Sequence, residues 1–141
     1  MPKSFLVDRK ILILIIGFIL SVFAHSCTEH NNHGYPSAVY FTEQGGVKTA
    51  NGNTPFSHLE IIHIKSGECL ASTNYNDLDT ATLEYSSISA TYDWIDVRQD
   101  YGSTQLQITV APMKDKETRK VWIEGYYVDE YAVIEIIQEA K

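Results

Sequence analysis

The sequence predicts an all-β fold, an antiparallel sandwich of about seven short strands. Apolar residues in the second half of the chain alternate with polar ones, as Leu106, Ile108 and Val110 do, which is typical of strands with one buried face. Segments rich in Gly, Asn, Asp and Ser separate these runs, and no segment shows the capped, amphipathic pattern of a helix. Short strands separated by such turn segments favour a two-sheet sandwich.

Seven segments are expected to form the strands. In chain order they are 38–42, 59–65, 80–85, 94–98, 105–110, 121–124 and 131–138. Alternation in the last two directs one set of side chains inward: Val121, Ile123, Ala132, Ile134 and Ile136. It directs the other set outward: Trp122, Glu124, Val133, Glu135 and Ile137. We expect Trp94 to fill the core.

The first 26 residues have the pattern of an export signal. Lys3, Arg9 and Lys10 precede an uncharged run over residues 11–24, which as a helix would span roughly 21 Å. This is short for a membrane core of about 30 Å and suits the apolar part of a signal peptide. The run ends at Ala24-His25-Ser26-Cys27. The alternatives are ordinary cleavage near Ala24 or an uncleaved anchor.

This pattern resembles a bacterial lipoprotein signal. The resemblance implies that Cys27 becomes the first mature residue and carries the acyl chains that anchor the protein in the membrane. Residues 27–37 are polar, with Gly34 and Pro36, and are expected to be a tether to the domain at residues 38–141. The implied location is the cell envelope, at the outer membrane.

Composition and charge restrict the function. Hydrophobic residues make up 44% and charged residues 21% of the chain, which is the composition of a globular protein and not of a disordered one. The net charge is −7. Without residues 1–26 it becomes −9, from 8 Lys and Arg against 17 Asp and Glu. Such a surface repels phosphate backbones, so nucleic acid is not an expected partner.

No catalytic or metal-binding constellation is recognised, so we expect no enzymatic activity, no metal and no cofactor. His58 and His63 are five residues apart in an expected strand, which puts them on opposite faces and prevents them from sharing a metal ion. Segment 74–79 is rich in Asn and Asp but lacks the Gly and the final Glu of a calcium loop. Cys69 has no second domain cysteine to pair with and is interpreted as a half-buried structural residue.

The C-terminal half, roughly residues 80–141, combines an Asp-Trp strand, a glycine turn, an alternating strand, an Arg-led strand and a last strand ending in Gln. The residues of this pattern are Tyr92-Asp93-Trp94-Ile95, Val97, Gly102, 106–111, 119–125 and Ile134-Glu135-Ile136-Ile137-Gln138. The pattern resembles the BACON domain, an immunoglobulin-like β-sandwich common in surface proteins of Bacteroidetes. Pro112-Met113-Lys114-Asp115 stands where the family has Asn. The resemblance implies a fold and an association with carbohydrate or mucin glycans.

Exposed aromatic residues are the candidate binding site. Trp122, Tyr126, Tyr127 and Tyr131 surround the expected final hairpin, and aromatic faces with polar neighbours are what sugar rings bind. Two alternatives stay open: these residues only stabilise the sheet as cross-strand pairs, or the protein is a structural spacer or a protein-interaction subunit. Asp79-Thr80-Ala81 also resembles the motif glycosylated on Thr in secreted Bacteroidetes proteins.

Overall fold

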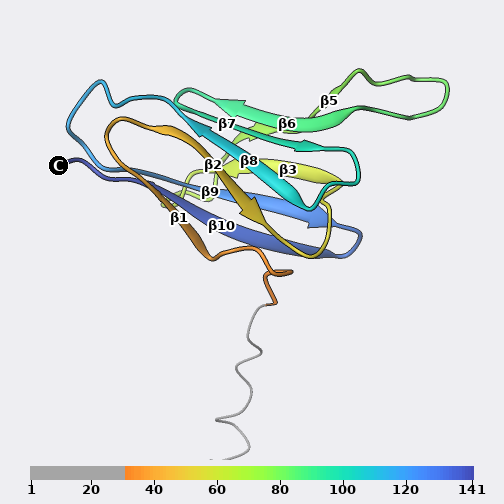
Figure 1. Cartoon of the computed structure of the whole chain (residues 1–141), viewed down its shortest axis with the longest axis horizontal. Coiled ribbons are helices and arrows are strands. Elements are labelled where there is room, and N and C mark those ends of the chain that lie inside the picture. Colours follow the sequence, from red (N-terminus) through yellow and green to blue (C-terminus); the bar gives the residue numbers. More distant parts are fainter. Residues whose placement is uncertain (1–30) are drawn as a thin grey trace, which may run out of the picture. The chain divides into compact units, whose positions relative to one another are not determined.

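The computed structural model describes residues 31–141, which form ten β-strands (Figure 1). The strands are β1 (Ala38–Phe41), β2 (Gly46–Asn51), β3 (His58–Ile62), β4 (Cys69–Ser72), β5 (Asn74–Asn76), β6 (Ser87–Tyr92), β7 (Ile95–Asp100), β8 (Gln105–Val110), β9 (Arg119–Tyr127) and β10 (Glu130–Gln138). In this part of the chain there is no helix long and apolar enough to span a bilayer. Cys27 and the rest of the expected signal lie outside the described residues.

The strands form two sheets of five that pack face to face. Sheet A has the order β1-β10-β9-β3-β4, and sheet B has the order β2-β8-β7-β6-β5. The predicted all-β sandwich is therefore confirmed, with ten strands instead of about seven. Neighbouring strands are antiparallel except β1, which runs parallel to β10.

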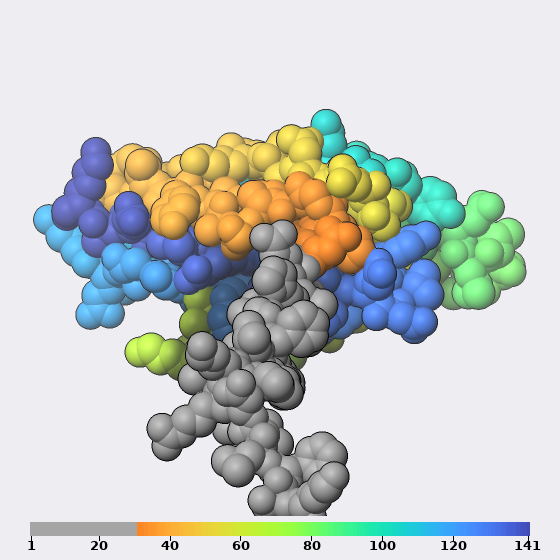
Figure 2. Space-filling view, turned by 90° about the horizontal axis from the view of Figure 1, so that it is seen from below, coloured from red at the N-terminus to blue at the C-terminus, as the bar shows by residue number. Residues whose placement is uncertain are grey.

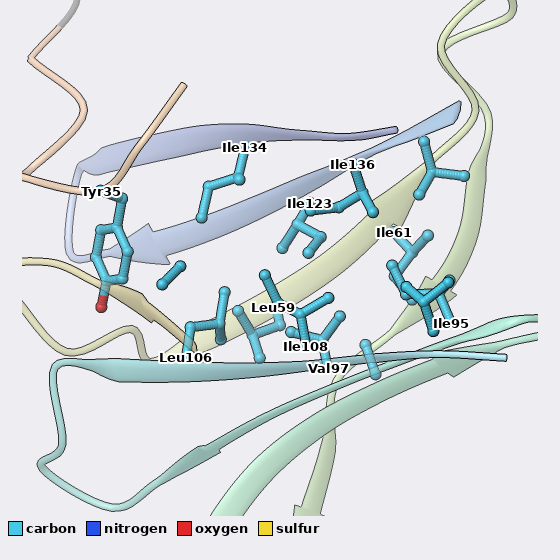
Figure 3. Close-up of a cluster of buried hydrophobic side chains, with 14 of the residues drawn as sticks. Tyr35, Leu59, Ile61, Ile95, Val97, Leu106, Ile108, Ile123, Ile134 and Ile136 are labelled. Carbon is cyan, nitrogen blue, oxygen red and sulfur yellow. The ribbon is translucent and has the colours of Figure 1, made fainter. Parts of the chain in front are cut away.

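The core lies between the two sheets and follows the predicted alternation (Figure 3). Leu106, Ile108 and Val110 of sheet B are buried against Ile134 and Ile136 of sheet A. Trp94, directly before β7, is also buried, as predicted. Because each strand turns every second side chain inward, the outer faces of both sheets stay available for polar and aromatic residues.

One predicted strand is wrong, and four strands were not predicted. Segment 80–85 is a turn between β5 and β6. It turns because the Asp79 carboxylate accepts hydrogen bonds from the backbone N–H groups of Ala81 (2.8 Å) and Thr82 (3.4 Å). The turn stands out from the end of the sandwich (Figures 1 and 2). The unpredicted strands are β2, β4, β5 and β6; β2, for example, buries only Ala50, so its sequence carries little apolar signal.

Ile137 corrects a second expectation. Its side chain belongs to the outward set of β10, yet it is only 5% exposed. Ile137 pairs with Tyr40 of β1 and with Lys120 of β9, and the long side chains on either side cover it. Ile137 therefore does not extend an exposed apolar patch.

The expected tether over residues 27–37 is also corrected in its second half. Asn32 donates to the Val133 carbonyl (2.9 Å) and accepts from the Val133 N–H (2.8 Å), so it is hydrogen-bonded to β10 on both sides. Tyr35 is 4% exposed and belongs to the core. The domain thus begins at about Asn32, and only residues before it remain as the expected tether.

Candidate functional site

The four aromatic residues predicted to bind ligand lie in two different places. Tyr126 and Tyr131 are partners across β9 and β10 on the outer face of sheet A, with ring centroids 6.1 Å apart. Trp122 lies on the same face, half-buried, opposite Glu135 and beside Ile62. Tyr127 instead lines a hollow at the end of the sandwich. The structure therefore does not bring the four into one site.

The Tyr126 hydroxyl is already engaged by the protein. It donates to Glu124 Oε2 at 2.5 Å and lies 3.4 Å from Glu60 Oε2, and Glu60 Oε1 is 3.2 Å from His58 Nε2. Burial, and then the two carboxylates, raise the pKa of Tyr126 far above its ordinary value because they disfavour the phenolate. Much of the polar chemistry on this face is thus satisfied within the sheet.

An open hollow lined by tyrosines lies at the end of the sandwich. It measures about 250 Å³. We call it the tyrosine pocket, and its lining residues are Pro55, Phe56, Ser57, Tyr85, Tyr101, Gly102 and Tyr127. Tyr101 is 70% exposed and Tyr127 is 42% exposed, so both side chains are accessible from solvent.

The tyrosine rings are held in position by one another. The ring centroids of Tyr85 and Tyr101 are 5.1 Å apart with perpendicular planes, and those of Tyr75 and Tyr85 are also 5.1 Å apart, in an edge-to-face contact. The Tyr75 hydroxyl donates to the Ser57 carbonyl at 3.1 Å. Edge-to-face contacts of this kind are favourable for aromatic quadrupoles. The row of rings is therefore ordered without a ligand.

The floor of the pocket is rigid because it belongs to the core. Phe56 is buried and stacks on Tyr35 at 4.4 Å. The buried Gln99 side chain accepts from the Phe56 N–H at 2.7 Å and donates to the Tyr35 hydroxyl at 3.0 Å. Gly125 of β9 leaves room for the Phe56 ring, since a Cβ there would lie 2.5 Å from it. The segment that carries Pro55 and Ser57 is thereby fixed.

Backbone conformation directs the pocket tyrosines. Tyr101 lies in the β7–β8 turn before Gly102, whose φ of 71° is the left-handed region that glycine adopts without strain. Val128 also has a positive φ, 52°, where the chain reverses between β9 and β10 just after Tyr127. For a β-branched residue this conformation is unusual. The local turns therefore place Tyr101 and Tyr127 at the mouth of the pocket.

The lining of the pocket is aromatic and uncharged, and the loops around it are acidic. Burial, and then the neighbouring Tyr75 and Tyr101, raise the pKa of Tyr85 above its ordinary value. The loops that carry the tyrosines also carry carboxylates, at Glu84, Asp100, Asp129 and Glu130. An anionic ligand is repelled here, whereas a ligand with apolar C–H faces and hydroxyl groups is suited to the rings.

The residues that carry the resemblance to the BACON domain have structural roles. The Arg119 guanidinium lies 4.7 Å from the Trp94 ring centroid and donates to Gln138 Oε1 from Nε (3.1 Å) and Nη2 (2.6 Å). Gln138 is fully buried. Arg119 also donates to the Ala111 carbonyl at 3.2 Å. Of the residues that carry the resemblance, Gly102 lines the tyrosine pocket, whereas Arg119, Trp94 and Gln138 do not.

Other sequence candidates are dispersed. His58 contacts Glu60 and Ser72 on sheet A, whereas His63 contacts Ser66 in the β3–β4 turn. Cys69 is exposed and not half-buried as expected; partial desolvation, and then Glu60, raise the pKa of its thiol. Among residues 31–141 there is no group of three or more His, Cys, Asp or Glu side chains arranged to hold a metal ion.

Two pocket tyrosines, Tyr85 and Tyr101, were not predicted from the sequence, and neither was Tyr75, which packs against Tyr85. Tyr101 carried a usable signal, because a large aromatic residue inside an Asp-Tyr-Gly turn has no core to enter. Tyr85 carried none, since segment 80–85 was interpreted as a strand, and Tyr75 lies in segment 74–79, which was considered only as a calcium loop. Thr80 lies on the exposed part of the same turn.

Comparisons with known proteins give a distant structural similarity. No protein-family profile and no curated protein matches the sequence. A protein from Bacteroides thetaiotaomicron solved by NMR is similar, with 13% sequence identity and a TM-score of 0.45 over 76% of this chain and 83% of that chain.

Proposed function

We propose that this chain is a non-catalytic, BACON-like lipoprotein of the cell envelope that binds carbohydrate, such as mucin glycans. In this proposal Cys27 carries the lipid that anchors it to the outer membrane, and the domain from about Asn32 onward holds the binding site. The observation that carries the proposal is the tyrosine pocket. It is open, its rings are ordered by contacts with one another, and Tyr101 and Tyr127 in its lining are exposed.

Sugar rings suit this pocket for a physical reason. Their axial C–H groups pack on aromatic faces while their hydroxyl groups exchange hydrogen bonds with polar atoms at the edge. Tyr101 and Tyr127 supply exposed faces, and the tyrosine hydroxyls and Ser57 supply the polar atoms. Because the floor is held by the Gln99 hydrogen bonds, little conformational entropy is lost on binding.

The outer face of sheet A supports binding less well. The Tyr126 hydroxyl is occupied by Glu124, and Trp122 is half-buried. Trp122, Tyr126 and Tyr131 remain a second candidate surface, and the same experiment separates it from the pocket.

Calorimetric titration of the full-length protein in detergent micelles, against a panel of plant, host and mucin glycans, tests the proposal. Tyr127→Ala is expected to weaken binding by about 1–3 kcal/mol, as loss of a central aromatic does. Tyr40→Ala, which removes a 54% exposed tyrosine outside the pocket, is the matched control. If Trp122→Ala weakens binding and Tyr127→Ala does not, the site is on sheet A. If the folded protein binds none of the glycans in the panel, glycan binding is refuted.

One observation favours the alternative, a structural spacer or protein-interaction subunit. The projecting β5–β6 turn exposes two leucines, Leu78 at 41% and Leu83 at 72%, and exposed apolar side chains on a projecting turn suit a protein partner. This function predicts no response to any glycan. It also predicts that Leu83→Asp abolishes co-purification of an envelope protein that crosslinks to the wild-type chain.

A further inference from the structure

A second hollow lies on the outer face of sheet B and is polar throughout. It measures about 150 Å³. We call it the polar groove, and its lining residues are Thr49, Arg98, Asp100, Ser103, Gln105 and Gln107. They come from three neighbouring strands, β2, β8 and β7, and from the turn after β7. All six side chains carry hydrogen-bonding groups, in contrast to the aromatic lining of the tyrosine pocket.

Several of these groups are available to a ligand. Within residues 31–141, the side chains of Thr49, Gln105 and Gln107 make no hydrogen bond to the protein, and all three are exposed. Arg98 uses Nε for Asp100 at 3.3 Å, which leaves the other guanidinium N–H groups facing solvent. Two amides, a hydroxyl and a guanidinium together can both donate to and accept from the hydroxyl groups of a sugar.

One turn forms a wall of both hollows. Asp100 and Ser103 line the polar groove, and Tyr101 and Gly102, between them in sequence, line the tyrosine pocket. A Cβ built on Gly102 would meet no atom within 4 Å. The top of the turn is therefore open, so a chain of sugar units can pass over Gly102 from one hollow to the other.

We propose that the tyrosine pocket and the polar groove form one extended site for a neutral oligosaccharide. One sugar unit stacks on the pocket tyrosines, the chain crosses the β7–β8 turn at Gly102, and the following units hydrogen-bond to Gln105, Gln107 and Thr49. A neutral chain fits because the one guanidinium in the groove is already paired with Asp100 and the surrounding loops are acidic. This inference rests on the proposed carbohydrate binding and deepens it.

Dependence of affinity on chain length tests the extended site. The probes are mono-, di-, tetra- and hexasaccharides of β-1,4-linked glucose, xylose, mannose and N-acetylglucosamine, titrated into the full-length protein in detergent. In the series that binds, the hexasaccharide is expected to bind at least about tenfold more tightly than the disaccharide, since added hydrogen bonds each contribute severalfold. Gln107→Ala is expected to weaken the affinity for the hexasaccharide by about 3- to 10-fold and to leave the affinity for the disaccharide unchanged.

The controls separate failure of this inference from failure of the proposed function. Val47→Ala changes an exposed residue of β2 on the same face, outside the groove, and should leave every affinity unchanged. The extended site would be overturned, and glycan binding left in place, by the following result: the disaccharide and the hexasaccharide bind with equal affinity, Tyr127→Ala abolishes this binding, and Gln107→Ala does not change it. If none of the four series binds, both the extended site and the proposed carbohydrate binding are overturned for these glycans.

Discussion

Replacing Gln138 by leucine tests the hydrogen-bond network that joins the last strand to two loops. Gln138 is fully buried. Its Oε1 accepts two hydrogen bonds from the Arg119 guanidinium. Its Nε2 lies 3.0 Å from the carbonyl oxygens of Thr42 and Ala111 and 3.3 Å from that of Glu43. One side chain thus donates hydrogen bonds to backbone carbonyl groups in the loop after β1 and in the loop after β8.

The expected cost follows from these contacts. Leucine has nearly the volume of glutamine, so the cavity term is small. The interaction with the charged guanidinium is worth about 1.5–3 kcal/mol and each neutral amide bond about 0.5–1.5 kcal/mol. Burial of the apolar leucine side chain recovers part of the free energy lost with these hydrogen bonds. Gln138→Leu is therefore expected to lower the free energy of unfolding by about 2–5 kcal/mol. For a domain of ordinary stability, about 5–15 kcal/mol, this is a large share.

Urea unfolding followed by circular dichroism measures this loss, with Glu139→Ala, an exposed neighbour, as the matched control. A double-mutant cycle with Arg119→Met is expected to show a coupling energy of about 1–3 kcal/mol. A loss in Gln138→Leu no larger than that in Glu139→Ala, or the absence of coupling, would show that the network contributes little.

Three other substitutions probe the start of the domain, the pocket floor and sheet A. Asn32→Ala should lower the free energy of unfolding by about 1–3 kcal/mol, because the Val133 N–H loses its acceptor; an unchanged urea midpoint would restore the tether interpretation. Gly125→Ala should cost about 1–3 kcal/mol through the clash with Phe56; an unchanged Tm in calorimetry would contradict this. Burial and Glu124 raise the pKa of Tyr126, so the unfolded chain releases this proton first and stability falls as pH rises above about 10. Tyr126→Phe should make that alkaline decline shallower, and an identical slope would refute it.

Sheet B shows how far the sequence determines strands. Segment 105–110 alternates cleanly and was predicted as it stands, because every inward residue is large and apolar. Strand β6 of the same sheet alternates between small polar residues and Ile88 or Ala90, a pattern that carries little signal. Edge strands such as β2 need few buried side chains, so their pairing with β8 is decided by the rest of the sheet.

The candidate site was predictable in its chemistry and not in its location. An excess of aromatic residues near the final hairpin was visible in the sequence, and Tyr127 does line the pocket. Its partners Tyr85 and Tyr101 come from the β5–β6 turn and the β7–β8 turn. The sequence around each of these three tyrosines gives no indication of the other two, since loops from different hairpins meet only after the sheets have packed.

The sequence by itself determined the strand periodicity, the buried face of each alternating strand and the acidic surface, because these depend on side chains a few residues apart. Tertiary structure alone decided that Asn32 and Tyr35 belong to the domain, that Ile137 is covered and that three tyrosines surround one hollow. Each of these depends on strand register and on loop contacts between segments far apart in the chain. Such contacts form only when the hydrophobic faces of the two sheets have closed on each other.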